Sequence, residues 1–116
     1  MKEIHPLTSL DSVGAFLEQH KLSFLYVSRP ECNVCHSILP KLRELLEHYP
    51  KIHLGHIDAS QVEEIAAKYL IFTVPAMLLV IDKKEYIRSD RFVRFENLNQ
   101  EIEQIYELVT QDDPAE

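Results

Sequence analysis

Residues 24–35, FLYVSRPECNVC, lead from a short apolar stretch through a turn into two cysteines. The stretch Leu22–Val27 is almost continuously apolar, which is typical of a strand covered on both faces of its sheet. After Cys32 the apolar side chains recur at helical spacing as far as His48. The cysteines therefore fall where a strand ends and a helix begins, and the other predicted elements lie on either side of this junction.

Changes in the apolar period predict those other elements. They are an edge strand at Ile4 that ends at Pro6, a helix from a Thr8 or Ser9 cap to His20, the helix Asn33–His48, the strand Ile52–Asp58, a helix opened by a Ser60–Glu63 capping box and running to Tyr69, the strand Ala76–Ile81, the strand Glu85–Phe92 and a last helix capped by Asn97. Pro40 removes a hydrogen bond inside the second helix and should kink it. The last helix should bury Leu98, Ile102, Ile105, Leu108 and Val109. Alternating strands and helices with a final hairpin predict an α/β fold: a central mixed sheet with helices on both faces.

The length of 116 residues allows one domain, which we place at residues 1–111, followed by a frayed acidic tail at 112–116. The formal net charge of −7 is not spread evenly. Residues 1–95 hold twelve Lys and Arg and twelve Asp and Glu, whereas residues 96–116 hold seven acids and no Lys or Arg. Because no wider basic face exists, we expect no nucleic-acid partner.

Only two cysteines occur, Cys32 and Cys35, too few and too close together for a disulfide scaffold. The N-terminal Met1–Pro6 lacks the apolar core of a signal peptide, and runs such as Val74–Ile81 are too short to cross a bilayer. We therefore expect a cytoplasmic protein without membrane contact. In that reducing compartment a close cysteine pair indicates catalysis, redox sensing or metal binding more than a structural bridge.

The position of the pair favours redox chemistry. Cys32 would lie at or near the N-cap of its helix, where free N–H groups and the helix dipole stabilise a thiolate. Cys32 should therefore be the exposed nucleophile. Cys35, one turn further along, should point into the domain and act as the resolving thiol that attacks a mixed disulfide.

Three other interpretations of the pair are open. The cysteines could be small apolar residues that happen to begin a helix. With His53 and His56 they loosely imitate a zinc site, but three-residue spacing on a strand sends the two imidazoles to opposite faces. Cys32, Cys35 and His36 match the string that attaches c-type haem, although neither an export segment nor room for haem is evident. We expect no metal and no cofactor.

Three features in order resemble the thioredoxin family over nearly the whole chain. The cysteine pair follows a core strand, Pro40 lies five residues after Cys35, and Val74-Pro75 directly precedes another core strand. The resemblance implies the thioredoxin-like three-layer fold, a cis Pro75 facing the cysteines, and protein disulfides as substrates. It also implies that Val74 offers its backbone to an extended substrate segment, and that a thioredoxin-reductase-like protein donates electrons. We expect a monomer.

The chain also departs from the family pattern. Glu31 precedes Cys32 where thioredoxins carry tryptophan, and Phe92 lies in the loop where they carry a groove-lining glycine. Tyr26 and Leu54 replace the buried aspartate and its lysine partner, which help to deprotonate the resolving cysteine. Cys35 would then resolve slowly unless Tyr26, a water or a substrate group assists.

We therefore expect a thiol–disulfide oxidoreductase that acts on protein disulfides through Cys32 and Cys35. The substrate-contacting residues should be Val74, Pro75, Glu31 and Phe92. The alternative is a redox-responsive or non-catalytic binding module that uses the thioredoxin groove with little turnover.

Overall fold

The computed structural model describes residues 1–111, so the expected tail at 112–116 lies outside the described residues. The elements follow the order β1 (Ile4–Leu7), α1 (Leu10–Gln19), β2 (Leu22–Ser28), α2 (Asn33–Leu46), β3 (His53–Asp58), α3 (Ile65–Tyr69), β4 (Ala76–Ile81), β5 (Lys84–Ser89) and α4 (Phe95–Thr110). The predicted alternation of strands and helices is confirmed.

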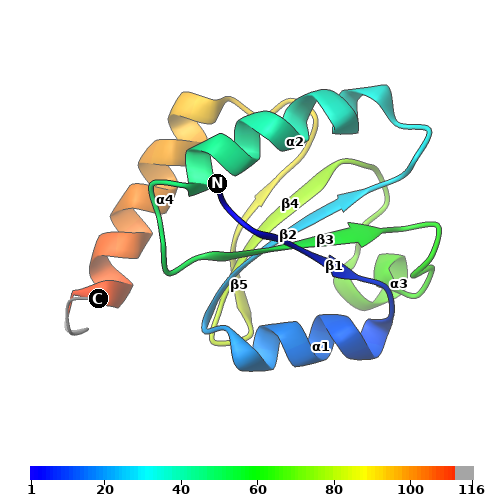
Figure 1. Cartoon of the computed structure of the whole chain (residues 1–116), viewed down its shortest axis with the longest axis horizontal. Coiled ribbons are helices and arrows are strands. Elements are labelled where there is room, and N and C mark those ends of the chain that lie inside the picture. The colour runs from blue at the N-terminus through cyan, green and yellow to red at the C-terminus, as the bar shows by residue number, and fades with distance from the viewer. Residues whose placement is uncertain (112–116) are drawn as a thin grey trace.

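A mixed sheet with the strand order β1-β3-β2-β4-β5 forms the middle layer. β1 and β2 pair with β3 in parallel, whereas β4 runs antiparallel to both β2 and β5. Helices α2 and α4 cover one face of the sheet, and α1 and α3 cover the other (Figure 1). The expected α/β three-layer fold is therefore confirmed.

The two faces of the sheet carry separate hydrophobic clusters. On the α2/α4 face, Phe24 and Tyr26 of β2 pack with α2 and α4, while Leu25 and Val27 pack with α1 and α3 on the opposite face. Every residue of β2 and β4 is buried, because both strands lie inside the sheet under helices on both sides. This burial explains why their sequences are apolar without alternation.

Gly55 of β3 allows the α1 layer to lie close to the sheet. A Cβ atom at this position would be 2.7 Å from Cδ1 of Leu7 and 3.1 Å from a ring carbon of Phe16. Both distances are shorter than ordinary van der Waals contact, so the bare backbone of Gly55 makes room for these side chains.

Three predicted boundaries in the first two thirds of the chain differ from the structure. The second helix ends at Leu46 and not at His48. β1 continues through Pro6 to Leu7, because an edge strand has one side without a neighbour, where the missing N–H of proline costs no ladder bond. The Ser60–Glu63 capping box does not form. The carboxylate of Asp58 instead accepts hydrogen bonds from the N–H and hydroxyl of Ser60, and α3 begins only after Glu64.

The C-terminal boundaries also differ from prediction. β5 ends at Ser89, and Phe92 lies in the loop that follows, where Asp90 accepts a hydrogen bond from the Phe92 N–H. Helix α4 begins after Arg94, so Asn97 is inside its first turn and does not cap it. The prediction that Leu108 belongs to the buried stripe of α4 is wrong. Leu108 is 72% exposed, because it lies on the same outer side of the helix as the exposed Glu101 and Gln104, whereas Ile105 and Val109 pack against the core.

The two histidines of β3 lie on opposite faces of the sheet, as predicted. His53 stacks on His20 with ring centroids 3.9 Å apart, whereas His56 contacts Tyr26 on the other face. Within residues 1–111, no helix is long and apolar enough to cross a membrane.

Candidate active site

Cys32 is the N-cap residue of α2, at the turn that follows β2. Its backbone is extended, and its sulfur accepts a hydrogen bond from the N–H of Cys35 at 3.2 Å. This N–H is one of the donors that a helix start leaves without a backbone partner. The same donor and the positive end of the helix dipole would stabilise negative charge on the Cys32 sulfur.

Cys32 and Cys35 are joined in a disulfide, with their Cα atoms 5.3 Å apart. The two sulfurs differ in access. Cys32 is partly exposed, whereas Cys35 is 1% exposed and belongs to the hydrophobic cluster between α2 and the sheet. An incoming sulfur compound can therefore reach Cys32 and not Cys35.

The turn before Cys32 is held by two hydrogen bonds. The N–H of Cys32 donates to the carbonyl oxygen of Arg29 at 3.1 Å, and the ring of His36 lies 2.8 Å from the carbonyl oxygen of Pro30. Glu31 occupies this turn with an exposed side chain. The turn is thus anchored to the first turn of α2, which keeps the position of Cys32 defined.

Three polar residues form a group near the start of α2, which we call the polar cluster: Tyr26, Ser28 and His56. The Tyr26 hydroxyl donates a hydrogen bond to the carbonyl oxygen of Cys35 at 2.5 Å. The Ser28 hydroxyl and Nε2 of His56 lie 2.7 Å apart, and the rings of Tyr26 and His56 have centroids 5.7 Å apart. The cluster follows from the register, because Tyr26 and His56 are partners on neighbouring strands.

Burial controls the ionisation of the polar cluster. It raises the pKa of Tyr26 to about 12, so this hydroxyl stays protonated near neutral pH. Burial also lowers the pKa of His56, an effect that the charge of Asp58 opposes and that of His36 reinforces. The Asp58 carboxyl has a lowered pKa, chiefly because the Ser60 hydroxyl donates to it. At neutral pH the cluster therefore holds a neutral phenol and a neutral imidazole.

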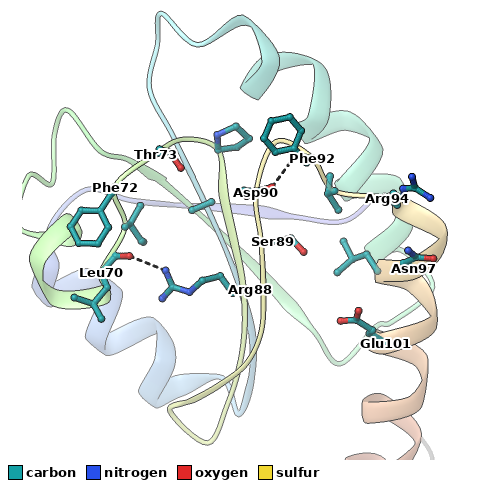
Figure 2. Close-up of a pocket in the computed structure, with 15 residues that line it drawn as sticks. Leu70, Phe72, Thr73, Arg88, Ser89, Asp90, Phe92, Arg94, Asn97 and Glu101 are labelled. Carbon is teal, nitrogen blue, oxygen red and sulfur yellow. Dashed lines mark hydrogen bonds between the residues drawn. The ribbon is translucent and has the colours of Figure 1, made fainter.

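A groove of about 590 Å³ begins at Pro75 and runs over β5 towards α4. In Figure 2, Leu70 and Phe72 come from one wall, and Phe92, Arg94 and Asn97 come from the other. Phe72 is 81% exposed and Phe92 is 82% exposed, although both rings are large and apolar. Exposed aromatic side chains around a groove are typical of a surface that binds another molecule.

The loop 70–75 forms one wall of this groove. The Val74–Pro75 peptide bond is cis, and Leu70 at the end of α3 has a left-handed backbone with φ of 56°. Arg88 of β5 donates hydrogen bonds to the carbonyl oxygens of Tyr69 and Leu70 at 2.7 and 3.0 Å. Arg88 also pairs with Glu85, so the guanidinium fixes the loop to the edge of the sheet.

The sequence of residues 9–104 matches the family model described as Thioredoxin. The chain is also 51% identical over 108 residues to the thioredoxin-like protein YdfQ of Bacillus subtilis, a match that covers 93% of this chain and 96% of that protein.

The chain belongs to the thioredoxin family.

Solved thioredoxin structures agree with this assignment. The reduced thioredoxin of Schistosoma mansoni superposes with a TM-score of 0.78 at 25% identity, covering 89% of this chain and 98% of that one. A thioredoxin mutant from Entamoeba histolytica gives a TM-score of 0.75 at 27% identity, covering 88% and 99%. The thioredoxin-like domain with its Cys32–Cys35 pair supports thiol–disulfide redox activity.

The structure brings some of the expected substrate-contacting residues together and separates others. Pro75 and Phe92 line the groove described above. Val74 lines a smaller pocket on the other side of the same loop, together with Arg29. Glu31 is not among the residues that line the groove, although its exposed side chain lies beside Cys32.

Several residues of this thioredoxin site carry no recognisable signal in the sequence. Phe72, Arg88 and Ser28 belong to no motif in the sequence that indicates a binding or catalytic role. His56 was considered only as a zinc ligand. The signal for the polar cluster was available in the strand register, because Tyr26 and His56 share one face once β2 and β3 are paired in parallel.

Among the described residues 1–111, no group of three or more His, Cys, Asp or Glu side chains is arranged to hold a metal ion. The cysteine sulfurs are bonded to each other, and the two histidines of the imitation zinc motif lie on opposite faces of the sheet.

Proposed function

We propose that the protein is a thiol–disulfide oxidoreductase that reduces disulfides in other proteins. The observation that carries the proposal is the unequal access of two cysteines that are close enough to bond. Cys32 is partly exposed at the start of α2, and Cys35 is buried one turn behind it.

The reaction uses both sulfurs of the reduced protein. The Cys32 thiolate attacks one sulfur of a substrate disulfide, forming a mixed disulfide and releasing the other substrate sulfur as a thiolate that takes up a proton. Cys35 then loses its proton and attacks the Cys32 sulfur. The Cys32–Cys35 disulfide forms, and the second substrate sulfur leaves. The substrate gains the two electrons that the cysteine pair loses.

The surface around the cysteines supports a polypeptide substrate. Pro75 and Phe92 line a groove of about 590 Å³. Glu31 is exposed next to Cys32, and Val74 lines a smaller pocket on the other side of the loop 70–75. An extended segment could pair with the backbone near Val74 and place its disulfide next to Cys32.

The direct test is reduction of insulin by dithiothreitol with and without the purified protein. We expect faster reduction with the wild type and none above background with Cys32→Ser. In Cys35→Ser, a mixed disulfide between Cys32 and the substrate should accumulate and be identified by mass spectrometry. If the wild type does not accelerate insulin reduction and no mixed disulfide accumulates in Cys35→Ser, the proposal is contradicted.

The exposed rings of Phe72 and Phe92 favour a second candidate, a binding module with little turnover. Such a module would hold its partner through the groove whether or not the cysteines react. Two results together would favour the binding module. The wild type would not reduce insulin, and the double variant Cys32→Ser/Cys35→Ser would still bind the polypeptide partner.

We also propose that the protein acts as a cytoplasmic monomer that a thioredoxin-reductase-like protein reduces. A reversible cysteine pair suits a compartment in which thiols are kept reduced. Sedimentation of the reduced and oxidised protein tests the monomer. Reduction by a purified thioredoxin reductase and NADPH, without dithiothreitol, tests the electron donor.

A further inference from the structure

The buried position of Cys35 creates a chemical requirement for the resolving step. A thiol, not a thiolate, is the stable form of a cysteine in an apolar environment, because burial disfavours the charged form. Cys35 is 1% exposed and packs among the apolar residues between α2 and the sheet. Its attack on Cys32 therefore needs a group nearby that accepts its proton.

Tyr26 is hydrogen-bonded to the backbone of Cys35 and cannot serve as that acceptor. Its hydroxyl donates to the Cys35 carbonyl oxygen, and its pKa of about 12 keeps it protonated. Leu54 of β3 belongs to the same hydrophobic cluster as Cys35, but it carries no titratable group and is fully buried.

His56 lies directly against Tyr26 and carries a basic nitrogen. The two residues are register partners on β3 and β2, and their ring centroids are 5.7 Å apart. Nε2 of His56 lies 2.7 Å from the Ser28 hydroxyl, which fixes the orientation of the imidazole. The imidazole is only half-buried, so a proton that it accepts can pass on to solvent.

We propose that His56 accepts the proton of Cys35 during the resolving step, with Tyr26 and Ser28 as its positioning residues. This inference rests on the proposed function. The proton moves from the Cys35 sulfur to the neutral imidazole, and the Cys35 thiolate attacks the Cys32 sulfur of the mixed disulfide. The Cys32–Cys35 bond forms, and the bond from Cys32 to the substrate sulfur breaks. The substrate leaves as a thiolate that is protonated by solvent, and His56 returns its proton to solvent.

The groups around His56 are consistent with a base that works near neutral pH. Asp58 on the same strand favours the protonated imidazole, and His36 of α2 disfavours it. Tyr26 and Ser28 face it from β2, and its register partner on β1 is Pro6, which carries no charge. Burial adds to the effect of His36, so the imidazole is neutral and ready to accept a proton at pH 7.

The two steps of the reaction can be separated with a small aromatic disulfide, 5,5′-dithiobis(2-nitrobenzoate). Reduced protein releases one coloured thiolate when Cys32 attacks and a second when Cys35 resolves the mixed disulfide. Stopped-flow absorbance between pH 5 and 9 gives a rate for each phase. The probe needs no protein-binding groove, so this measurement remains informative even if reduction of protein disulfides fails.

In His56→Gln we expect the second phase to slow by about 10- to 100-fold at pH 7, while the first phase stays unchanged. The wild-type second phase should follow the titration of one group with a pKa below 6.5 and then level off. In the variant it should rise about tenfold for each pH unit, as expected of direct loss of the thiol proton to solvent. His20→Gln, on the opposite face of the sheet, is the matched control and should keep both phases.

Ser28→Ala gives a second test if His56→Gln folds poorly. It keeps the imidazole but removes its hydrogen-bond partner, so the inflection should remain and move to a different pH. An unchanged second phase in His56→Gln, or an unchanged inflection in Ser28→Ala, would overturn the proposal.

Discussion

The hydroxyl of Tyr26 donates a hydrogen bond of 2.5 Å to the carbonyl oxygen of Cys35. Tyr26 belongs to the central strand β2, and Cys35 lies in the first turn of α2, so this bond ties the helix start to the sheet. The contact lies wholly inside the protein, because both residues are buried. The position of Cys35 relative to the sheet is therefore held by Tyr26, a strand residue nine positions earlier in the chain.

We expect Tyr26→Phe to lower the free energy of unfolding by about 1–2 kcal/mol. The ring and its packing remain, but the carbonyl oxygen of Cys35 loses its side-chain donor inside the protein. Urea denaturation of the oxidised protein measures the change. Tyr86→Phe is the matched control, because Tyr86 is 52% exposed and should change stability by less than about 0.5 kcal/mol. Equal effects of the two variants would show that the bond contributes nothing.

We expect Gly55→Ala to destabilise the protein by about 1–3 kcal/mol, because the added methyl would lie 2.7 Å from Leu7 and 3.1 Å from Phe16. Gly14→Ala is the matched control. No atom lies within 4 Å of a Cβ at Gly14, which is in α1, so alanine there should stabilise the helix by about 0.5–1 kcal/mol. Thermal unfolding of both variants checks the opposite signs. A neutral Gly55→Ala would mean that the α1 layer can move away from the sheet without cost.

We expect Phe92→Ser to weaken the reduction of insulin several-fold while leaving the reaction with a small disulfide unchanged. Phe92 is 82% exposed and lines the groove, so its loss removes apolar contact area for a polypeptide and almost no packing of the fold. The measurement is kcat/KM for both substrates, with Tyr86→Ser as a control on β5 outside the groove. A parallel loss with both substrates would place Phe92 in the chemistry of the cysteines and not in substrate binding.

We expect stability to fall as the pH drops below about 6.5, in part through His20. Burial lowers the pKa of His20, and the nearby His5 lowers it further. The unfolded chain then binds more protons than the folded protein in this range. The contribution is present above pH 6.5 and is lost as the pH falls towards the lowered pKa.

Urea denaturation at pH 7.5 and 5.5 measures this dependence. In His20→Gln the drop between the two pH values should be smaller than in the wild type. His53 of β3 stacks on His20. Burial also lowers the pKa of His56, so His56 should retain part of the fall in stability. A drop that is unchanged by His20→Gln would contradict the assignment.

Much of the fold was predictable because the decisive signals are local in the sequence. The apolar strand before Cys32, the helical spacing after it and the apolar Ala76–Ile81 each specify an element without reference to the rest of the chain. The placement of Cys35 in the core also followed from its distance of one helical turn from Cys32.

The errors in the predicted boundaries and buried residues arose where a local pattern fits more than one arrangement. Ser60 could cap a helix or donate hydrogen bonds to Asp58. Only the fold shows that the Asp58 carboxylate at the end of β3 lies within hydrogen-bond distance of Ser60. The capping role of Asn97 failed because α4 starts after Arg94. Leu108 is exposed because it lies on the outer side of α4 with Glu101 and Gln104, and an apolar residue type alone does not show which side of a helix packs on the sheet.

The polar cluster could not be predicted from any single segment. Ser28 and His56 are 28 residues apart in the chain and meet only because β2 and β3 pair in a particular register. The same holds for Arg88, which reaches the end of α3 from β5. Long-range pairing of this kind is information that spacing along the chain does not carry.

The two hydrophobic clusters, one on each face of the sheet, also affect how the protein can change over evolutionary time. The cysteines and the polar cluster lie on the side of the sheet that α2 and α4 cover, whereas Gly55 and the residues that surround it lie on the side that α1 and α3 cover. Volume-conserving replacements in the second layer can accumulate without touching the sulfur chemistry. Val74, which packs against both clusters, is the position where such drift would first be felt at the cysteines.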